Sequence, residues 1–289
     1  DVCSSDLTTV INDFTAQALS IDALKSSEVS WLGSPRPTPG GIRGILGPGT
    51  GLGVAVTTTT GEIIPSEGGH VGFAPVNEHE IELLRALFPR YRRVSVERLL
   101  SGPGLENIYW ANVRLSGQSP RHEDPTPAAH QITSLAEQGD PIARRTVNDF
   151  FDIFASYAGD VALFTWATSG IYLSGGMVRK LAGFLDVERF RARFEDKGRF
   201  TRFCETVPLA WVTHPYPGLV GCAATILASD TAATSSAAVS GVTKNQAVAN
   251  AITAEARPVI TMARRWSALF EIAETTGTGA TVEIGRAHV

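Results

Sequence analysis

Cysteine and methionine are both scarce in this sequence, which has three cysteines and two methionines among 289 residues. Cys3, Cys204 and Cys222 lie far apart in the chain, so they form neither a disulfide framework nor a zinc-ligand pattern. A reducing, cytoplasmic location is therefore the expectation.

Basic charge is not in excess, since 25 lysines and arginines face 29 acidic residues and the net charge is −4. This balance argues against a nucleic-acid partner and against binding to an anionic membrane surface. No apolar run reaches the roughly 20 residues of a membrane span, and no secretory signal pattern is recognised. With 43% hydrophobic residues the chain can bury a sizeable core, in one large or two ordinary domains.

Both ends of the chain resemble translated DNA adapter. Residues 1–7 can be encoded by GACGTGTGCTCTTCCGATCTC, and the reverse complement of this string translates to residues 283–289. The string is similar to adapter oligonucleotides used in short-read sequencing. We therefore expect both segments to be artefacts and exclude them from the fold prediction. Source DNA that differs from the adapter at either end would contradict this hypothesis.

A glycine-rich stretch, GPGTGLG at residues 47–53, is the most informative feature of the sequence. It lies between apolar runs at 42–46 and 54–56, so it is predicted to form the turn of a β-hairpin. A dinucleotide fingerprint would open a helix here, and this context lacks one. Glycines let backbone N–H groups approach an anion, so the turn can cradle phosphate with Thr50 as a hydroxyl donor. A hairpin turn without a ligand explains the glycines equally well.

Polar side chains flank two further glycines in the stretch EGGHVGFAP at residues 67–75. In a turn, Glu67 and His70 can point at one small ligand, although a histidine beside apolar residues is more often structural. Ser95 is predicted to cap a helix with Glu97 in its first turn, where the carboxylate would compensate the helix dipole.

Hydrophobic periodicity predicts a chain of mixed helices and strands. Helices are predicted at 16–24, 78–88, 105–113, 128–135, 140–166 and 217–228, and strands at 171–173 and 209–212. Asn12 and Asp13 precede the first helix and can serve as its N-cap. Gly175 and Gly176 lie between a strand and a helix, which suits a nucleotide crossing the backbone, or a tight turn without a ligand.

Seven stretches, in this order, carry a resemblance to the bacterial ATP-dependent glucokinases. They are INDFTA (11–16), GPGTGLG (47–53), EGGHVGFAP (67–75), SVERLLSGPGL (95–105), LSGGM (173–177), FEDKGRF (194–200) and PGLVG (217–221). The resemblance covers residues 8–229. The repressor and open-reading-frame sugar kinases are less similar, because their zinc-binding cysteine cluster is absent.

This resemblance implies an α/β chain of the actin-like, ribonuclease-H-like fold, with two domains closing on a cleft. It implies D-glucose and ATP as substrates, Mg²⁺ with the ATP, no protein metal site, and allows a homodimer. Asp13 matches the general base for the sugar 6-hydroxyl. The implied binding residues are Asn12, Asp13, Glu67, His70 and Glu97 for the sugar, Gly49, Thr50 and Gly51 in the second phosphate loop, and Gly175 and Gly176 in the adenosine loop.

The resemblance also implies a domain plan. Residues 8–28 would be a remnant of the small domain, 29–213 the large α/β domain, and 214–229 a helix returning to the small domain. Residues 230–282 would be a linker and a helical tail, with helix predicted at 246–272.

The sequence departs from the family at its front. The family opens with a strand and a DIGGT-like first phosphate loop, whereas this chain begins at the INDFTA element. We therefore expect the chain as it stands to have no useful kinase activity, while sugar binding can survive. A kinase for another hexose, or a sugar-sensing regulator that uses the kinase fold as its ligand module, remain the alternatives.

Overall fold

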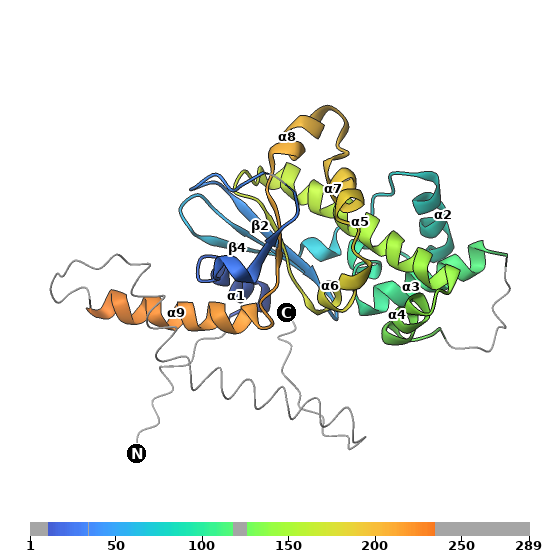
Figure 1. Cartoon of the computed structure of the whole chain (residues 1–289), viewed down its shortest axis with the longest axis horizontal. Coiled ribbons are helices and arrows are strands. Elements are labelled where there is room, and N and C mark those ends of the chain that lie inside the picture. The colour runs from blue at the N-terminus through green and yellow to red at the C-terminus, as the bar shows by residue number, and fades with distance from the viewer. Residues whose placement is uncertain (1–10, 34, 118–125, 235–289) are drawn as a thin grey trace, which may run out of the picture. The chain divides into compact units, whose positions relative to one another are not determined.

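A single mixed β-sheet organises the molecule (Figure 1). The structure, a computed structural model, describes residues 11–33, 35–117 and 126–234, with side chains as far as residue 225. Within these residues the strand order is β1-β6-β5-β2-β3-β4. The strands are β1 (Val29–Trp31), β2 (Arg43–Pro48), β3 (Leu52–Thr57), β4 (Ile63–Ser66), β5 (Ile171–Leu173) and β6 (Leu209–Val212).

Helices connect these strands. The α-helices are α1 (Asp13–Ser20), α2 (Glu78–Leu87), α3 (Gly102–Leu115), α4 (Ala129–Glu137), α5 (Pro141–Thr165), α6 (Gly176–Lys180), α7 (Val187–Glu195), α8 (Thr201–Thr206) and α9 (Pro217–Thr234). Short 3-10 turns are η2 (Ser26–Glu28), η3 (Gly68–His70), η4 (Val96–Arg98), η5 (Ala182–Phe184) and η6 (Gly198–Phe200).

The centre of the sheet is parallel and its β2–β3–β4 side is an antiparallel meander. Strand β5 runs parallel to both β2 and β6, while β2 pairs with β3 from Arg43↔Thr57 to Pro48↔Leu52. The predicted glycine hairpin is therefore confirmed as the β2–β3 turn. Because β2 and β5 are parallel, the hairpin and the Gly175–Gly176 turn lie at the same edge of the sheet.

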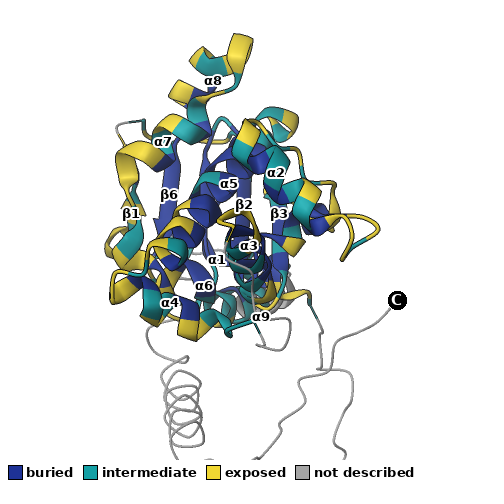
Figure 2. Ribbon diagram, turned by 90° about the vertical axis from the view of Figure 1, so that its right-hand side faces the viewer, coloured by how far each residue is buried: buried dark blue, intermediate teal, exposed yellow. Residues whose placement is uncertain are grey.

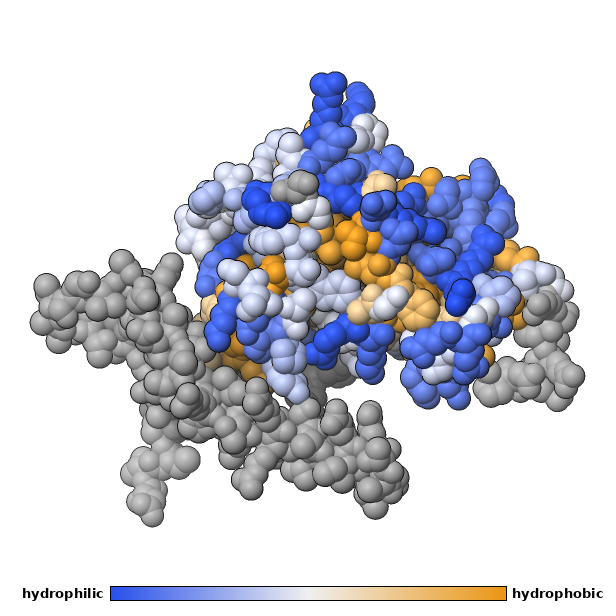
Figure 3. Space-filling model, in the orientation of Figure 1, coloured by the Kyte–Doolittle hydropathy of each residue, from blue (hydrophilic) through white to orange (hydrophobic). Residues whose placement is uncertain are grey.

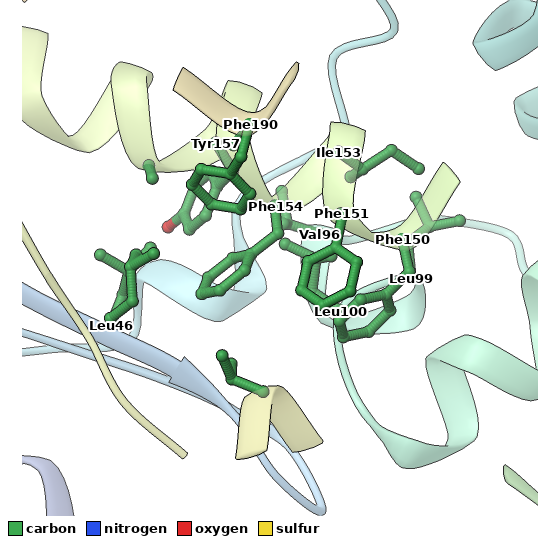
Figure 4. Close-up of a cluster of buried hydrophobic side chains, with 14 of the residues drawn as sticks. Leu46, Val96, Leu99, Leu100, Phe150, Phe151, Ile153, Phe154, Tyr157 and Phe190 are labelled. Atoms are coloured by element: carbon green, nitrogen blue, oxygen red, sulfur yellow. The ribbon is translucent and has the colours of Figure 1, made fainter. Parts of the chain in front are cut away.

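Each face of the sheet is covered by helices. Successive strand residues point to opposite faces, so Ile45 packs with Phe14 of α1, while Leu46 packs with the core under α5. Figure 4 shows that larger core, in which Phe154 and Phe190 meet edge to face with ring centroids 5.7 Å apart. The predicted core helix 140–166 corresponds to α5, which is capped by the Asp140 side chain through Ala143 N at 2.8 Å.

The chain divides into two compact units, residues 1–222 and 223–289. The first unit holds the whole sheet and every candidate site residue. The finer division at residues 28 and 213 stays a prediction.

Two local predictions are wrong. The Ser95 side chain makes no capping hydrogen bond to η4, and Ser101 instead caps the following helix, α3, by accepting from Gly104 N at 2.9 Å. The second wrong prediction is the start of the linker at residue 230, since α9 continues to Thr234. The predicted helix at 246–272 and the segments 1–7 and 283–289 lie outside the described residues.

Buried residues line the sheet and the inner faces of the helices, and exposed residues follow their outer faces (Figure 2). On the face drawn in Figure 3 the surface is largely hydrophilic, with apolar residues gathered near its middle. In the described part of the chain, no helix combines the length and the apolar character needed to cross a bilayer.

Candidate active site

The tip of the β2–β3 hairpin, Gly49–Gly51, is an open turn at the edge of the sheet. Gly49 N donates to Gly51 O at 2.7 Å, so the Gly49 amide serves the turn itself. In the described residues no hydrogen bond uses the N–H of Thr50 or Gly51, and Thr50 is exposed. Two backbone donors and one hydroxyl are therefore left to face an anion.

Two glycines beside the tip are required by close neighbours. A Cβ at Gly47 would lie 2.2 Å from Ser174 O, and one at Gly53 would lie 1.7 Å from the ring of Phe14. Phe14 follows Asp13 directly, so the start of α1 packs against the hairpin strand.

Asn12 and Asp13 lie at that start, and both are exposed. Asn12 Oδ1 accepts hydrogen bonds from Phe14 N at 2.9 Å and Thr15 N at 3.1 Å, which confirms the predicted N-cap. The cap fixes where α1 begins and uses only the amide oxygen of Asn12. The Asp13 carboxylate is thereby presented to solvent beside β3.

Glu67 directly precedes η3 and His70 is its last residue, and this turn packs on the same hairpin. Glu67 Oε2 and His70 Nε2 are 3.7 Å apart, and the two side chains are 86% and 58% exposed respectively. A Cβ at Gly69 would lie 2.2 Å from Leu52 O. Thus the backbone between the two polar residues touches the hairpin, as α1 does.

Tyr157, on α5, holds this turn from below. Its hydroxyl donates to Gly68 O at 2.7 Å, and the side chain is buried. Burial, with a smaller contribution from Asp160, raises the pKa of Tyr157 far above its usual value. The hydroxyl therefore remains a donor at any physiological pH.

Glu97, in η4, reaches the hairpin tip directly. Its Oε2 accepts a hydrogen bond from Leu52 N at 2.9 Å, and a Cβ at Gly51 would lie 2.5 Å from the same oxygen. Val96 N donates to Val71 O at 2.9 Å, so η4 is also joined to the segment that carries His70. This hydrogen bond to the hairpin differs from the role that was predicted for Glu97, which was to compensate the dipole of a helix.

Gly175 and Gly176 lie on the other side of the hairpin. Gly175 has φ +101°, and a Cβ there would lie 2.5 Å from Pro48 O, so the position requires glycine. Helix α6 has only five residues. The case for a nucleotide here therefore depends on the bare backbone of the two glycines and on the adjoining pocket.

That pocket has a volume of about 200 Å³ and is lined by both glycines, Gln17, Arg179, His214 and Gly218, among others. Small-molecule sites usually span ~300–1,000 Å³, so the pocket matches one part of a nucleotide, such as its base or ribose. Gln17 Oε1 accepts from Ser174 Oγ at 2.6 Å, which ties α1 to the Gly175 turn.

His214 is the titratable group of this pocket. Tyr216 N donates to its Nδ1 at 3.0 Å, which requires that nitrogen to be unprotonated, and Nε2 lies 3.8 Å from Glu28 Oε1. Burial lowers the pKa of His214, only partly opposed by Glu28. The imidazole is therefore neutral near pH 7.

The structure thus gathers the predicted segments around one hairpin. Phe14 contacts it through its ring, which a Cβ at Gly53 would meet. Gly69 and Gly175 lie so close to its backbone that a Cβ of their own would clash, and Glu97 binds it by a hydrogen bond. No hydrogen bond or ion pair of the described residues joins Asp13 to Glu67, His70 or Glu97. Their common neighbour is the hairpin.

Sequence reasoning missed several residues that support this arrangement. Tyr157 lies in a long apolar helix, and nothing in the local sequence separates it from other core aromatics. Arg179 and His214 are far apart in the sequence and share one pocket only in the folded chain, so local pattern does not connect them. Ser101 had a usable signal, because it precedes Gly-Pro-Gly at the start of a helical pattern.

Comparison with known proteins gives a consistent result. The family model described as Glucokinase matches residues 4–229, a range that includes residues 4–7 of the expected adapter segment. A curated glucokinase from Chromohalobacter salexigens is 42% identical over 215 residues, which are 73% of this chain and 66% of that protein. A curated glucokinase from Xylella fastidiosa is 43% identical over 225 residues, 74% of this chain and 65% of that protein.

Solved structures agree with this match. A glucokinase from an Antarctic psychrotroph has a TM-score of 0.70 at 33% identity, covering 75% of this chain and 67% of that one. The chain spans about two thirds of the length of the curated relatives that it matches. Its α/β architecture is the actin-like sugar kinase fold that was predicted. With the family model matched over residues 4–229, these findings establish that the chain belongs to the glucokinase family.

Proposed function

We propose that the chain supplies the sugar-binding groups and the general base for transfer of the γ-phosphoryl group of ATP to the 6-hydroxyl of D-glucose, a reaction that gives glucose 6-phosphate and ADP. Membership of the glucokinase family supports this proposal. The observation that carries it is the convergence on one glycine hairpin of the Asp13, Glu67–His70 and Glu97 segments with the Gly175 turn.

Asp13 is the proposed general base. Phosphoryl transfer needs little covalent chemistry from the protein, so positioning, charge stabilisation and one base dominate. The exposed Asp13 carboxylate would accept the proton of the 6-hydroxyl as that oxygen attacks phosphorus. The Asn12 cap holds the helix start in place while this occurs.

Asn12, Glu67, His70 and Glu97 are the proposed partners of the other sugar hydroxyls. A hexose presents several hydroxyls, each both donor and acceptor, and carboxylates, an amide and an imidazole can satisfy both roles. A site of this type discriminates strongly against analogues that lack a hydroxyl. Competition among hexoses would define the selectivity.

The nucleotide is proposed to lie between the hairpin and the Gly175 turn. The N–H groups of Thr50 and Gly51 and the Thr50 hydroxyl would donate to its phosphates, and the bare backbone at Gly176 leaves room for it. The described residues contain no cluster of three metal-ligating side chains. Mg²⁺ is proposed to enter with the ATP, since it is often bound through substrate phosphates, waters and only one or two carboxylates, and it would neutralise phosphate charge.

Replacement of Asp13 by asparagine tests the chemistry. We expect Asp13→Asn to lower kcat by ~10²–10⁴-fold, because general-base assistance is lost, and to change glucose affinity by less than about threefold. The assay couples glucose 6-phosphate formation to a dehydrogenase. It uses a version of the chain that is extended to the length of the curated relatives. Calorimetry on the present chain measures glucose affinity.

Asp22→Asn is the matched control. Asp22 pairs with Arg43 at the opposite end of β2 from the hairpin tip, so its replacement should leave kcat within about twofold. Normal turnover by the Asp13→Asn variant would assign the base elsewhere. Failure of the extended chain to phosphorylate glucose would contradict the proposed function itself.

A further inference from the structure

One short segment, residues 97–102, holds the hairpin tip from both sides. Gly102 N donates to Gly49 O at 2.8 Å on the incoming side, and Leu52 N donates to Glu97 Oε2 at 2.9 Å on the outgoing side. Ser101 Oγ donates to Glu97 O at 2.8 Å and so braces the segment internally. The position of the turn between Gly49 and Leu52 therefore depends on this segment.

The carboxylate of Glu97 lies directly against the tip. A side chain at position 51 would meet Oε2 at 2.5 Å, so Gly51 serves this approach as well as the turn. A carboxylate that accepts from a backbone N–H forms a charge-assisted bond, stronger than one between neutral groups.

Only one of the two Glu97 oxygens is used in this contact. In the described part of the chain no hydrogen bond involves Oε1, and the side chain is half-buried. A carboxylate offers about four acceptor positions, so a second partner can bind Oε1 while Oε2 keeps Leu52 N. In the proposed function that second partner is a sugar hydroxyl.

We propose that Glu97 is a positioning residue that couples sugar binding to the triphosphate-binding turn. This inference rests on the proposed function. Oε1 would accept from a sugar hydroxyl while Oε2 holds Leu52 N, so occupation of the sugar site orders Glu97 and, through it, the N–H groups of Thr50 and Gly51. By linkage, nucleotide binding then strengthens glucose binding by the same factor.

A nucleotide titration in the absence of sugar tests the positioning role. We expect Glu97→Ala to weaken binding of the ATP analogue AMPPNP, with Mg²⁺ and without glucose, by about tenfold, because an anchor of the turn is lost. Glu97→Gln should stay within about threefold of the parent chain, because an amide oxygen can still accept from Leu52 N. A residue that only contacts sugar would change neither value.

The matched control is Glu67→Ala. Glu67 is also a proposed sugar ligand, but its side chain is exposed and lies within ion-pair distance of His70. We expect its replacement to weaken glucose binding and to leave sugar-free AMPPNP affinity unchanged. Saturating glucose should raise AMPPNP affinity in the parent chain, and Glu97→Ala should abolish that increase.

Hydrogen exchange at the Leu52 amide tests the anchor without any ligand. Exchange should be about tenfold faster in Glu97→Ala than in the parent chain, and near the parent rate in Glu97→Gln. Unchanged Leu52 exchange, or unchanged sugar-free AMPPNP affinity in Glu97→Ala, would overturn the positioning role. Absence of glucose binding by the parent chain would instead contradict the proposed function, and Leu52 exchange would still decide whether Glu97 holds the turn.

Discussion

At the scale of single residues, the candidate site depends on groups that never touch a substrate. Tyr157 supports the Gly68–Gly69 turn from inside the core, and Phe14 sets the distance between α1 and the hairpin. Both are buried. A shift of either side chain would displace Glu67, His70 or Asp13, which are themselves exposed and make few contacts.

Tyr157→Phe isolates the contribution of one buried hydroxyl. The substitution removes one of the two donors to Gly68 O and leaves Val71 N, which donates at 3.2 Å. We expect a loss of about 0.5–1.5 kcal/mol in the free energy of unfolding. Urea denaturation measures it. Tyr109→Phe is the control, because Tyr109 is half-buried and its hydroxyl makes no hydrogen bond among the described residues. Equal midpoints for the Tyr157→Phe variant and the parent chain would show that the hydroxyl does not support the turn.

At the scale of elements, the sequence predicted the helices and strands that have a clear local signal. Helices α2 and α5 were predicted from the spacing of their apolar residues, the hairpin from glycines between two apolar runs, and β5 and β6 from short apolar runs. Asn12 or Asp13 was predicted as the N-cap of the first helix, and the structure shows that it is Asn12.

Other elements gave weaker local signals. Strand β1 has three residues and is defined by its antiparallel pairing with β6, which lies about 180 residues further along the chain. The cap at Ser95 was wrong because a 3-10 turn, with the Ser101-capped helix after it, competes for the same segment. The contact of Glu97 with Leu52 joins residues 45 positions apart, so local pattern cannot predict it.

Gly53→Ala tests how α1 is seated on the hairpin. The new methyl group would lie 1.7 Å from the Phe14 ring, so α1 must shift or Phe14 must leave its place. We expect a loss of about 1–3 kcal/mol in the free energy of unfolding, as for other overpacked sites. Gly72→Ala is the control, because nothing lies within 4 Å of a Cβ there. A Gly53→Ala variant as stable as the Gly72→Ala variant would mean that α1 is not held by this contact.

At the scale of the whole molecule, the sheet supplies the geometry on which the proposed function depends. Parallel pairing of β2 with β5 brings the hairpin and the Gly175 turn to one edge, and the helices on the two faces bring the remaining segments there. Groups from residues 12 to 97 thus approach one place through a shared neighbour. Five of the seven stretches meet there, namely residues 11–16, 47–53, 67–75, 95–105 and 173–177.

A crystal structure of this chain with D-glucose bound tests the central claim most directly. We predict one sugar beside the hairpin tip, with its 6-hydroxyl within hydrogen-bond distance of the Asp13 carboxylate and its other hydroxyls on Glu67, His70 and Glu97. Glucose bound at another place, or Asp13 too far from the sugar held by the other three residues, would contradict it.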